Sequence, residues 1–165
     1  MPDQRSNPDF PTSIGLLLLR VGACGFMVLH GWGKVQMLID GRSAEFVDPI
    51  GLGATTGLAL TAFAEFLCAM LVGAGFITRI AAIPPALSMA VSAFVSQADR
   101  PLTSGEAVRQ LVNGVSTAET YSSKEPALLF LAAFLALFFT GPGRFSVDFA
   151  LRVRRAEKAL QDARS

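Results

Sequence analysis

Four long apolar segments constrain the fold of this chain more than any other feature. A helix that crosses a bilayer needs about 20 mostly apolar residues. The segments have close to that length and are apolar nearly all round, whereas the helices of a soluble bundle would have broad polar faces. The sequence therefore predicts an all-α integral membrane four-helix bundle. The four segments are Ile14–Trp32, Gly57–Ile77, Ile80–Ser96 and Pro126–Thr140.

The composition agrees with a membrane location and argues against several other functions. Only 16% of the 165 residues are charged and the net charge is +1, so we expect the lipid bilayer as a partner and no nucleic acid. The two cysteines, Cys24 and Cys68, lie inside apolar segments, where we expect them to pack as small apolar residues. No cluster of Cys and His has the spacing of a metal site, so no metal is predicted.

The distribution of charge predicts the orientation of the chain in the membrane. Basic residues are retained on the cytoplasmic side, and most of those here follow the fourth segment. We therefore expect both termini in the cytoplasm, with a tail at 1–13, a membrane domain at 14–143 and a basic amphipathic tail at 144–165. The expected location is the inner (plasma) membrane. The leader before the first segment lacks a basic region, so we expect a retained span and not a cleaved signal peptide. The basic residues of the tail are Arg144, Arg152, Arg154, Arg155, Lys158 and Arg164.

Shorter helices are predicted outside the spans. The loop after the third segment contains SGEAVRQLVNGV, in which Ser104 is the expected N-cap of a short interfacial helix. A smaller helical candidate, SAEFV, lies in the first loop. In the tail, Phe149, Val153, Ala156 and Leu160 form one apolar stripe. This pattern fits a helix on the membrane surface as well as an ordinary solvated helix.

Two charged residues lie within the predicted spans and need partners. Arg20 and Glu65 would each cost several kcal/mol if they faced lipid, so both should face the interior of the bundle. We expect Glu65 to pair with Arg20 or with His30, and Lys34 to extend toward the membrane boundary. The third segment adds a polar face, formed by Ser88, Ser92 and Ser96. These groups either lock the helices together or form a pocket that handles protons or binds a small polar ligand such as a quinone.

The end of the first segment reads LHGWGK and contains the only His and the only Trp of the chain. Gly31 allows a neighbouring helix to approach closely, and Trp32 is suited to the membrane interface. Lys34 lies near the carbonyl-rich end of the helix, where a cation is favoured.

Further motifs follow at the boundaries of the predicted spans. GFITR, which contains Thr78 and Arg79, forms the turn between the second and third spans. Glu125 opens the fourth span. GPGRFSVD closes it with Arg144, Ser146 and Asp148. In this last motif Gly-Pro-Gly is expected to stop the helix, and Ser146 is the expected N-cap of the tail helix. The negative charge of Asp148, in the first turn of the tail helix, interacts favourably with the dipole of that helix. We therefore predict a structural role for this motif.

Together with Arg20, HGWGK and Glu65, these motifs resemble the DoxX family of small four-helix membrane proteins. The resemblance extends from Arg20 to Asp148. Many relatives have a histidine near the end of the third span, where this chain has Gln97 and Asp99.

The resemblance implies a redox-linked membrane subunit. Founding members of the family are described as the membrane subunit of a thiosulfate:quinone oxidoreductase, and others are associated with oxidative-stress assemblies. In a subunit of this kind we expect Arg20, His30 and Glu65 to line the polar intramembrane site, with quinone as a candidate ligand and no particular substrate implied by the resemblance. No flavin, nicotinamide or haem motif is present, so no covalent cofactor is expected. The redox centre is expected on a peripheral oxidoreductase subunit or on the quinone itself.

Two alternatives remain open at this stage. The protein could be a non-catalytic anchor that holds a peripheral enzyme through the basic tail, or a carrier for a small solute. The carrier has less support because no inverted repeat is visible. The sequence leaves the substrate, the partner and the formation of a homo-oligomer undetermined.

Overall fold

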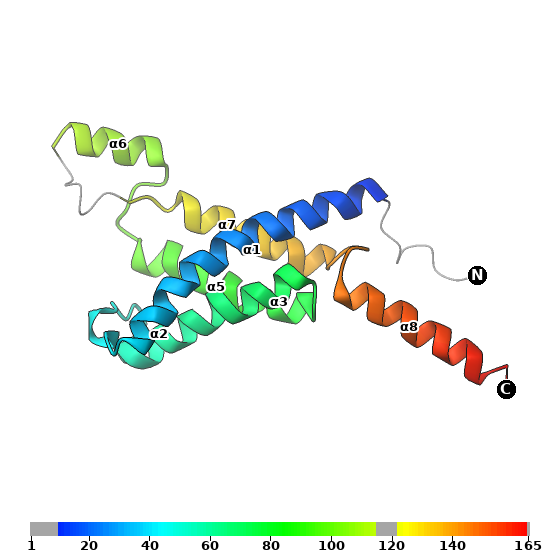
Figure 1. The fold of residues 1–165 in the computed structure, drawn as a ribbon. Coiled ribbons are helices and arrows are strands. Elements are labelled where there is room, and N and C mark those ends of the chain that lie inside the picture. Colours follow the sequence, from blue (N-terminus) through cyan, green and yellow to red (C-terminus); the bar gives the residue numbers. More distant parts are fainter. Residues whose placement is uncertain (1–9, 115–121, 165) are drawn as a thin grey trace.

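A computed structural model describes residues 10–114 and 122–164, and every regular element within these ranges is helical (Figure 1). The first helix, α1 (Phe10–Ile39), is 30 residues long and extends beyond the predicted span at both ends. It exposes large apolar side chains such as Leu18, Phe26 and Leu29, about 70% exposed, as expected for a helix that faces lipid. The predicted all-α class is confirmed for the described residues.

The second and third spans are each built from several consecutive helical pieces. The second consists of α2 (Ala54–Ala62), a π-helical turn (Phe63–Cys68) and α3 (Ala69–Ala74). After the turn at Gly75, the third span consists of α4 (Thr78–Ala81), α5 (Ile83–Val91) and a second π-helical turn (Ser92–Ser96). Pro84 and Pro85 lie in the first turn of α5, where the missing N–H group is tolerated.

The fourth apolar segment forms α7 (Glu125–Thr140), which packs along α5 and also contacts α1 and α4. Within the described parts of the chain, three helical stretches are long and apolar enough to cross a membrane, namely 10–39, 54–74 and 78–96, whereas α7 has only 16 residues. The core between them contains Met27, Val72, Phe134 and Leu137, none more than 1% exposed.

Shorter helices lie at the two ends of this body. The helix predicted in the third loop is α6 (Ser104–Val112), but its N-cap is Thr103, whose hydroxyl accepts from the Glu106 amide at 3.3 Å, and not Ser104. The first-loop candidate forms a 3₁₀ turn (Ser43–Glu45). The tail helix α8 (Val147–Asp162) leaves the body at the end where α1 begins and runs away from it (Figure 1).

Candidate functional site

The two ends of the helical body differ, and the predicted site residues divide between them. The closed end is defined here by Arg20, Gly75, Thr78, Ser146 and Asp148, which join α1, the α3–α4 turn and the α7–α8 turn. The open end is defined by the cavity beside Lys34, Glu65 and Ser88.

Arg20 is 1% exposed and belongs to the closed end. Its guanidinium donates to the carbonyl oxygen of Pro142 at 2.7 Å and to that of Phe145. Both acceptors lie in the turn between α7 and α8, where backbone carbonyls have no helical partner. The expected pairing of Glu65 with Arg20 is therefore wrong, because the Arg20 side chain is directed to the opposite end of the body.

Asp148 joins the tail helix to the turn between the second and third spans. Its carboxylate accepts from the backbone amides of Ile77 at 2.8 Å and Thr78 at 3.1 Å, and from the Thr78 hydroxyl at 3.2 Å. Its own amide donates to the Gly75 carbonyl at 2.9 Å. Ser146 is the N-cap of α8, as predicted, and its hydroxyl accepts from the Phe149 amide at 3.1 Å. These bonds fix α8 to the span boundary through its first turn.

Gly75 makes the closed end sterically possible. Its φ is +72°, which favours glycine, and a Cβ at this position would overlap Arg20 Nη1 and lie 2.6 Å from the Ser146 Cβ. The close approach of these three segments therefore depends on the absence of a side chain at residue 75.

Other predicted motif residues lie outside both clusters. Arg79 Nη2 donates to the Phe139 carbonyl at 3.4 Å, and the Arg144 side chain is exposed. Glu125 accepts from the Ser104 amide at 2.8 Å, so it ties the start of α7 to the start of α6.

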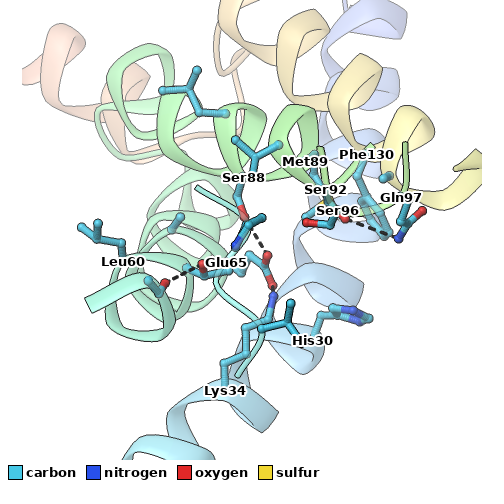
Figure 2. A pocket seen from close by; sticks show the side chains of 18 of the residues that line it. His30, Lys34, Leu60, Glu65, Ser88, Met89, Ser92, Ser96, Gln97 and Phe130 are labelled. Carbon is cyan, nitrogen blue, oxygen red and sulfur yellow. Dashed lines mark hydrogen bonds and ion pairs between the residues drawn. The ribbon is translucent and has the colours of Figure 1, made fainter. Parts of the chain in front are cut away.

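At the open end, Glu65 is 1% exposed and has two side-chain partners. One carboxylate oxygen forms an ion pair with Lys34 Nζ, and the other accepts from the Ser88 hydroxyl at 2.8 Å. Lys34 was not among the partners expected for Glu65, which were Arg20 and His30. Figure 2 shows Glu65 between Lys34 and Ser88, with the His30 ring pointing away from the carboxylate. His30 has no hydrogen-bond partner among the described residues.

Close contact between α1 and the second span brings Lys34 and Glu65 together. A Cβ at Gly31 would lie 2.6 Å from the Glu65 carbonyl carbon and 2.6 Å from the Phe66 nitrogen, so only glycine fits there. The contact falls on the π-helical turn that carries Glu65, and such turns are frequent at functional sites. At the next residue of α1, the Trp32 ring packs on Phe66 with centroids 5.5 Å apart.

A cavity of about 930 Å³ opens beside this cluster, between α1, the second and third spans, the first loop and the start of α7. Its polar wall comes from His30, Lys34 and Glu65 together with the serines of the third span (Figure 2). Much of the remaining lining is apolar, as is usual for a ligand site. The sequence already showed the serine face and His30, but not that Lys34 would be the partner of Glu65. The apolar lining includes Met27, Leu60, Phe63, Leu87, Met89 and Phe130.

No group of metal-ligating side chains occurs within residues 10–114 and 122–164, and both cysteines are buried and free. The open end is thus a polar cluster at the wall of a largely apolar cavity, with donors that a small ligand could use.

Comparison with known proteins identifies the family. No curated protein and no solved structure matches this chain. The family model of DoxX matches residues 15–98, which include Arg20, the HGWGK motif, Glu65 and the GFITR turn but not Glu125 or GPGRFSVD. With about half of its length matched and three helices able to span a bilayer, the chain belongs to the DoxX family of membrane proteins.

Proposed function

We propose that this protein is a redox-linked membrane subunit whose open-end cavity binds a quinone. In this proposal four helices span the plasma membrane with both termini in the cytoplasm, and a peripheral oxidoreductase carries the redox centre. The observation that carries the proposal is the polar cluster of Lys34, Glu65 and Ser88 at the wall of a largely apolar cavity of about 930 Å³.

The groups at this wall fit the polar ends of a quinone. A lysine ammonium has three donors, and Glu65 is the one described residue that uses a donor of Lys34, so the others can bind a ligand carbonyl. The His30 ring lines the cavity without a protein partner among the described residues, so its ring nitrogens are available to a ligand. When bound, a quinone would accept two electrons from the peripheral subunit and two protons, and we assign the delivery of one of these protons to His30.

The edge of the cavity supports a ligand that arrives from the bilayer. Leu60, Phe63 and Leu87 line the cavity and are still 50–61% exposed. Apolar side chains at a mouth suit a ligand that is dissolved in hydrocarbon, because no polar rim has to be desolvated on entry.

The test is binding of a short-chain ubiquinone analogue to the full-length protein in lipid nanodiscs. We expect Lys34→Met to weaken binding about 10-fold, the effect of losing roughly 1.4 kcal/mol of interaction. Arg42→Met is the matched control, because Arg42 is an exposed basic residue that pairs with Glu45 in the first loop. Equal affinity of wild type and Lys34→Met would place the ligand elsewhere, and no binding by the wild type would refute the quinone site.

The redox role requires a second test. Quinone reduction is measured in native membranes that contain the wild type, His30→Ala, Glu65→Gln or Glu45→Gln. We expect the first two variants to lose the activity while remaining folded, and the third to retain it. Unchanged activity in both cavity variants would contradict the redox proposal even if quinone binds.

A second candidate, an anchor for a peripheral enzyme, is favoured by one observation. The tail helix α8 has no buried residue and projects from the body, so its surface is available to a partner. Purification from native membranes in mild detergent, followed by mass spectrometry of proteins and lipids, separates the two candidates. A stoichiometric soluble partner without quinone supports the anchor, whereas an oxidoreductase with quinone supports the redox subunit.

A further inference from the structure

The tail helix α8 is joined to the helical body through the bonds of Asp148 in its first turn, and the rest of the helix runs away from the body (Figure 1). None of its side chains is buried, and large apolar side chains on it remain open, with Val153 40% and Leu160 61% exposed. A helix with such a surface needs a partner that is not part of the helical body.

The start of α8 is held at the edge of the membrane. Asp148, in its first turn, bonds to Gly75, Ile77 and Thr78 in the turn that joins the second and third spans. A short turn between two spanning helices lies at the bilayer boundary. The first turn of α8 therefore begins at the level of the lipid headgroups.

The side chains of α8 are distributed as in helices that lie in the plane of a membrane surface. Phe149, Val153, Ala156 and Leu160 recur at intervals of four, three and four residues and form one narrow apolar stripe. After Asp148, four basic residues outnumber two acidic ones, and the net positive charge favours anionic headgroups over a neutral surface. The basic residues of this helix are Arg152, Arg154, Arg155 and Lys158.

We propose that α8 docks on the anionic surface of the bilayer at the closed end, with its apolar stripe inserted below the headgroups. The stripe contacts lipid and not a second protein, because α8 starts at the level of the headgroups. The basic residues lie on the faces of the helix beside and opposite the stripe, where they can reach anionic headgroups. This inference is independent of the quinone proposal.

The single tryptophan of the chain allows a direct test. In a Trp32→Phe background, Leu160→Trp places an indole on the stripe, and Gln161→Trp places one on the adjacent polar face. Each variant is reconstituted as one copy per nanodisc that contains an anionic lipid and lipids brominated on their acyl chains. Quenching of indole fluorescence then reports contact with the hydrocarbon.

We expect the emission from Trp at position 160 to be quenched at least twofold more than that at position 161. Adding Arg152→Gln and Arg155→Gln should reduce the quenching at 160 in anionic nanodiscs and leave it unchanged in zwitterionic ones. Equal quenching at both positions would overturn the proposal, as would no quenching at 160. If the indole at position 160 is protected from quenching only when two copies share a nanodisc, the stripe binds a second copy of the chain. That result would also overturn the proposal.

Discussion

The two ends of this molecule hold buried charges by different means. At the closed end Arg20 donates to the carbonyls of Pro142 and Phe145, which are backbone groups of a turn. At the open end Glu65 is equally buried but is held by the side chains of Lys34 and Ser88. Arg20 is enclosed by tightly packed turns, whereas Glu65 lies beside a cavity.

This difference indicates different tasks. Backbone carbonyls do not titrate and cannot turn away without unfolding the turn, so the closed end is suited to fixing the helices and the start of α8. Side-chain partners can change rotamer or exchange protons, so the open end can respond to a ligand. Variants at the closed end should therefore affect stability, and variants at the open end should affect ligand binding more than stability.

The largest expected effect is that of Arg20→Met at the closed end. The change removes two hydrogen bonds from a charged donor, and each such bond contributes about 1.5–3 kcal/mol, so the free energy of unfolding should fall by about 3–6 kcal/mol. The measurement is unfolding by SDS in mixed micelles, followed by circular dichroism. Arg144→Met, in the same turn but exposed, is the control and should change stability by less than about 0.5 kcal/mol. Similar losses for both variants would show that Arg20 has no special structural role.

Gly31→Ala should come next and tests the contact that places Glu65. The new methyl group would overlap the backbone of residues 65 and 66, and overpacking of this kind costs about 1–3 kcal/mol. The same variant should weaken quinone binding, because α1 must move away from the π-helical turn. Gly33→Ala is the matched control, since nothing lies within 4 Å of its new methyl group. If both variants behave alike in SDS unfolding, the close approach of α1 is not required.

Asp148→Ala should have a smaller effect that is confined to the closed end. It removes the carboxylate that accepts from the amides of Ile77 and Thr78, and losses of such caps cost about 0.5–2 kcal/mol. Asp148→Asn retains one acceptor oxygen and should lose less. Thermal unfolding and quinone binding are measured together. Weaker binding without a change in stability would contradict the separation of the two ends.

Ser88→Ala should have the smallest effect on stability. It removes one hydrogen bond to Glu65, with an expected loss of about 0.5–1.5 kcal/mol, while Lys34 remains paired. Ser96→Ala is the control, because Ser96 lines the same cavity and has no hydrogen-bond partner in the described part of the chain. Chemical unfolding compares the stabilities, and the nanodisc assay compares the affinities. A larger loss at Ser96 would indicate that the polar wall is centred on the end of the third span.

Much of the fold could be predicted from the sequence because its signals are local. Apolar length gave the positions of the three spans and of α7, and Ser146 was correctly predicted as the N-cap of α8. The N-cap of α6 was misplaced by one residue, since the Thr103 and Ser104 hydroxyls are adjacent and either could reach the first turn. Asp148 was interpreted as a partner of its own helix dipole, whereas its carboxylate contacts residues 77 and 78 of a different turn.

The sequence by itself determined that this is a helical membrane protein with charged residues inside its spans, because burial in lipid is decided by the apolar length of each segment. Only the tertiary structure decided which charges meet. Distance along a straight helix favoured Arg20 or His30 as the partner of Glu65, but the structure pairs it with Lys34. The contact of Gly31 with a π-helical turn brings Lys34 within reach, and Arg20 is occupied by the turn after α7. Such pairings depend on how closely helices approach and on which carbonyls a distant turn leaves free, and neither is encoded within a single segment.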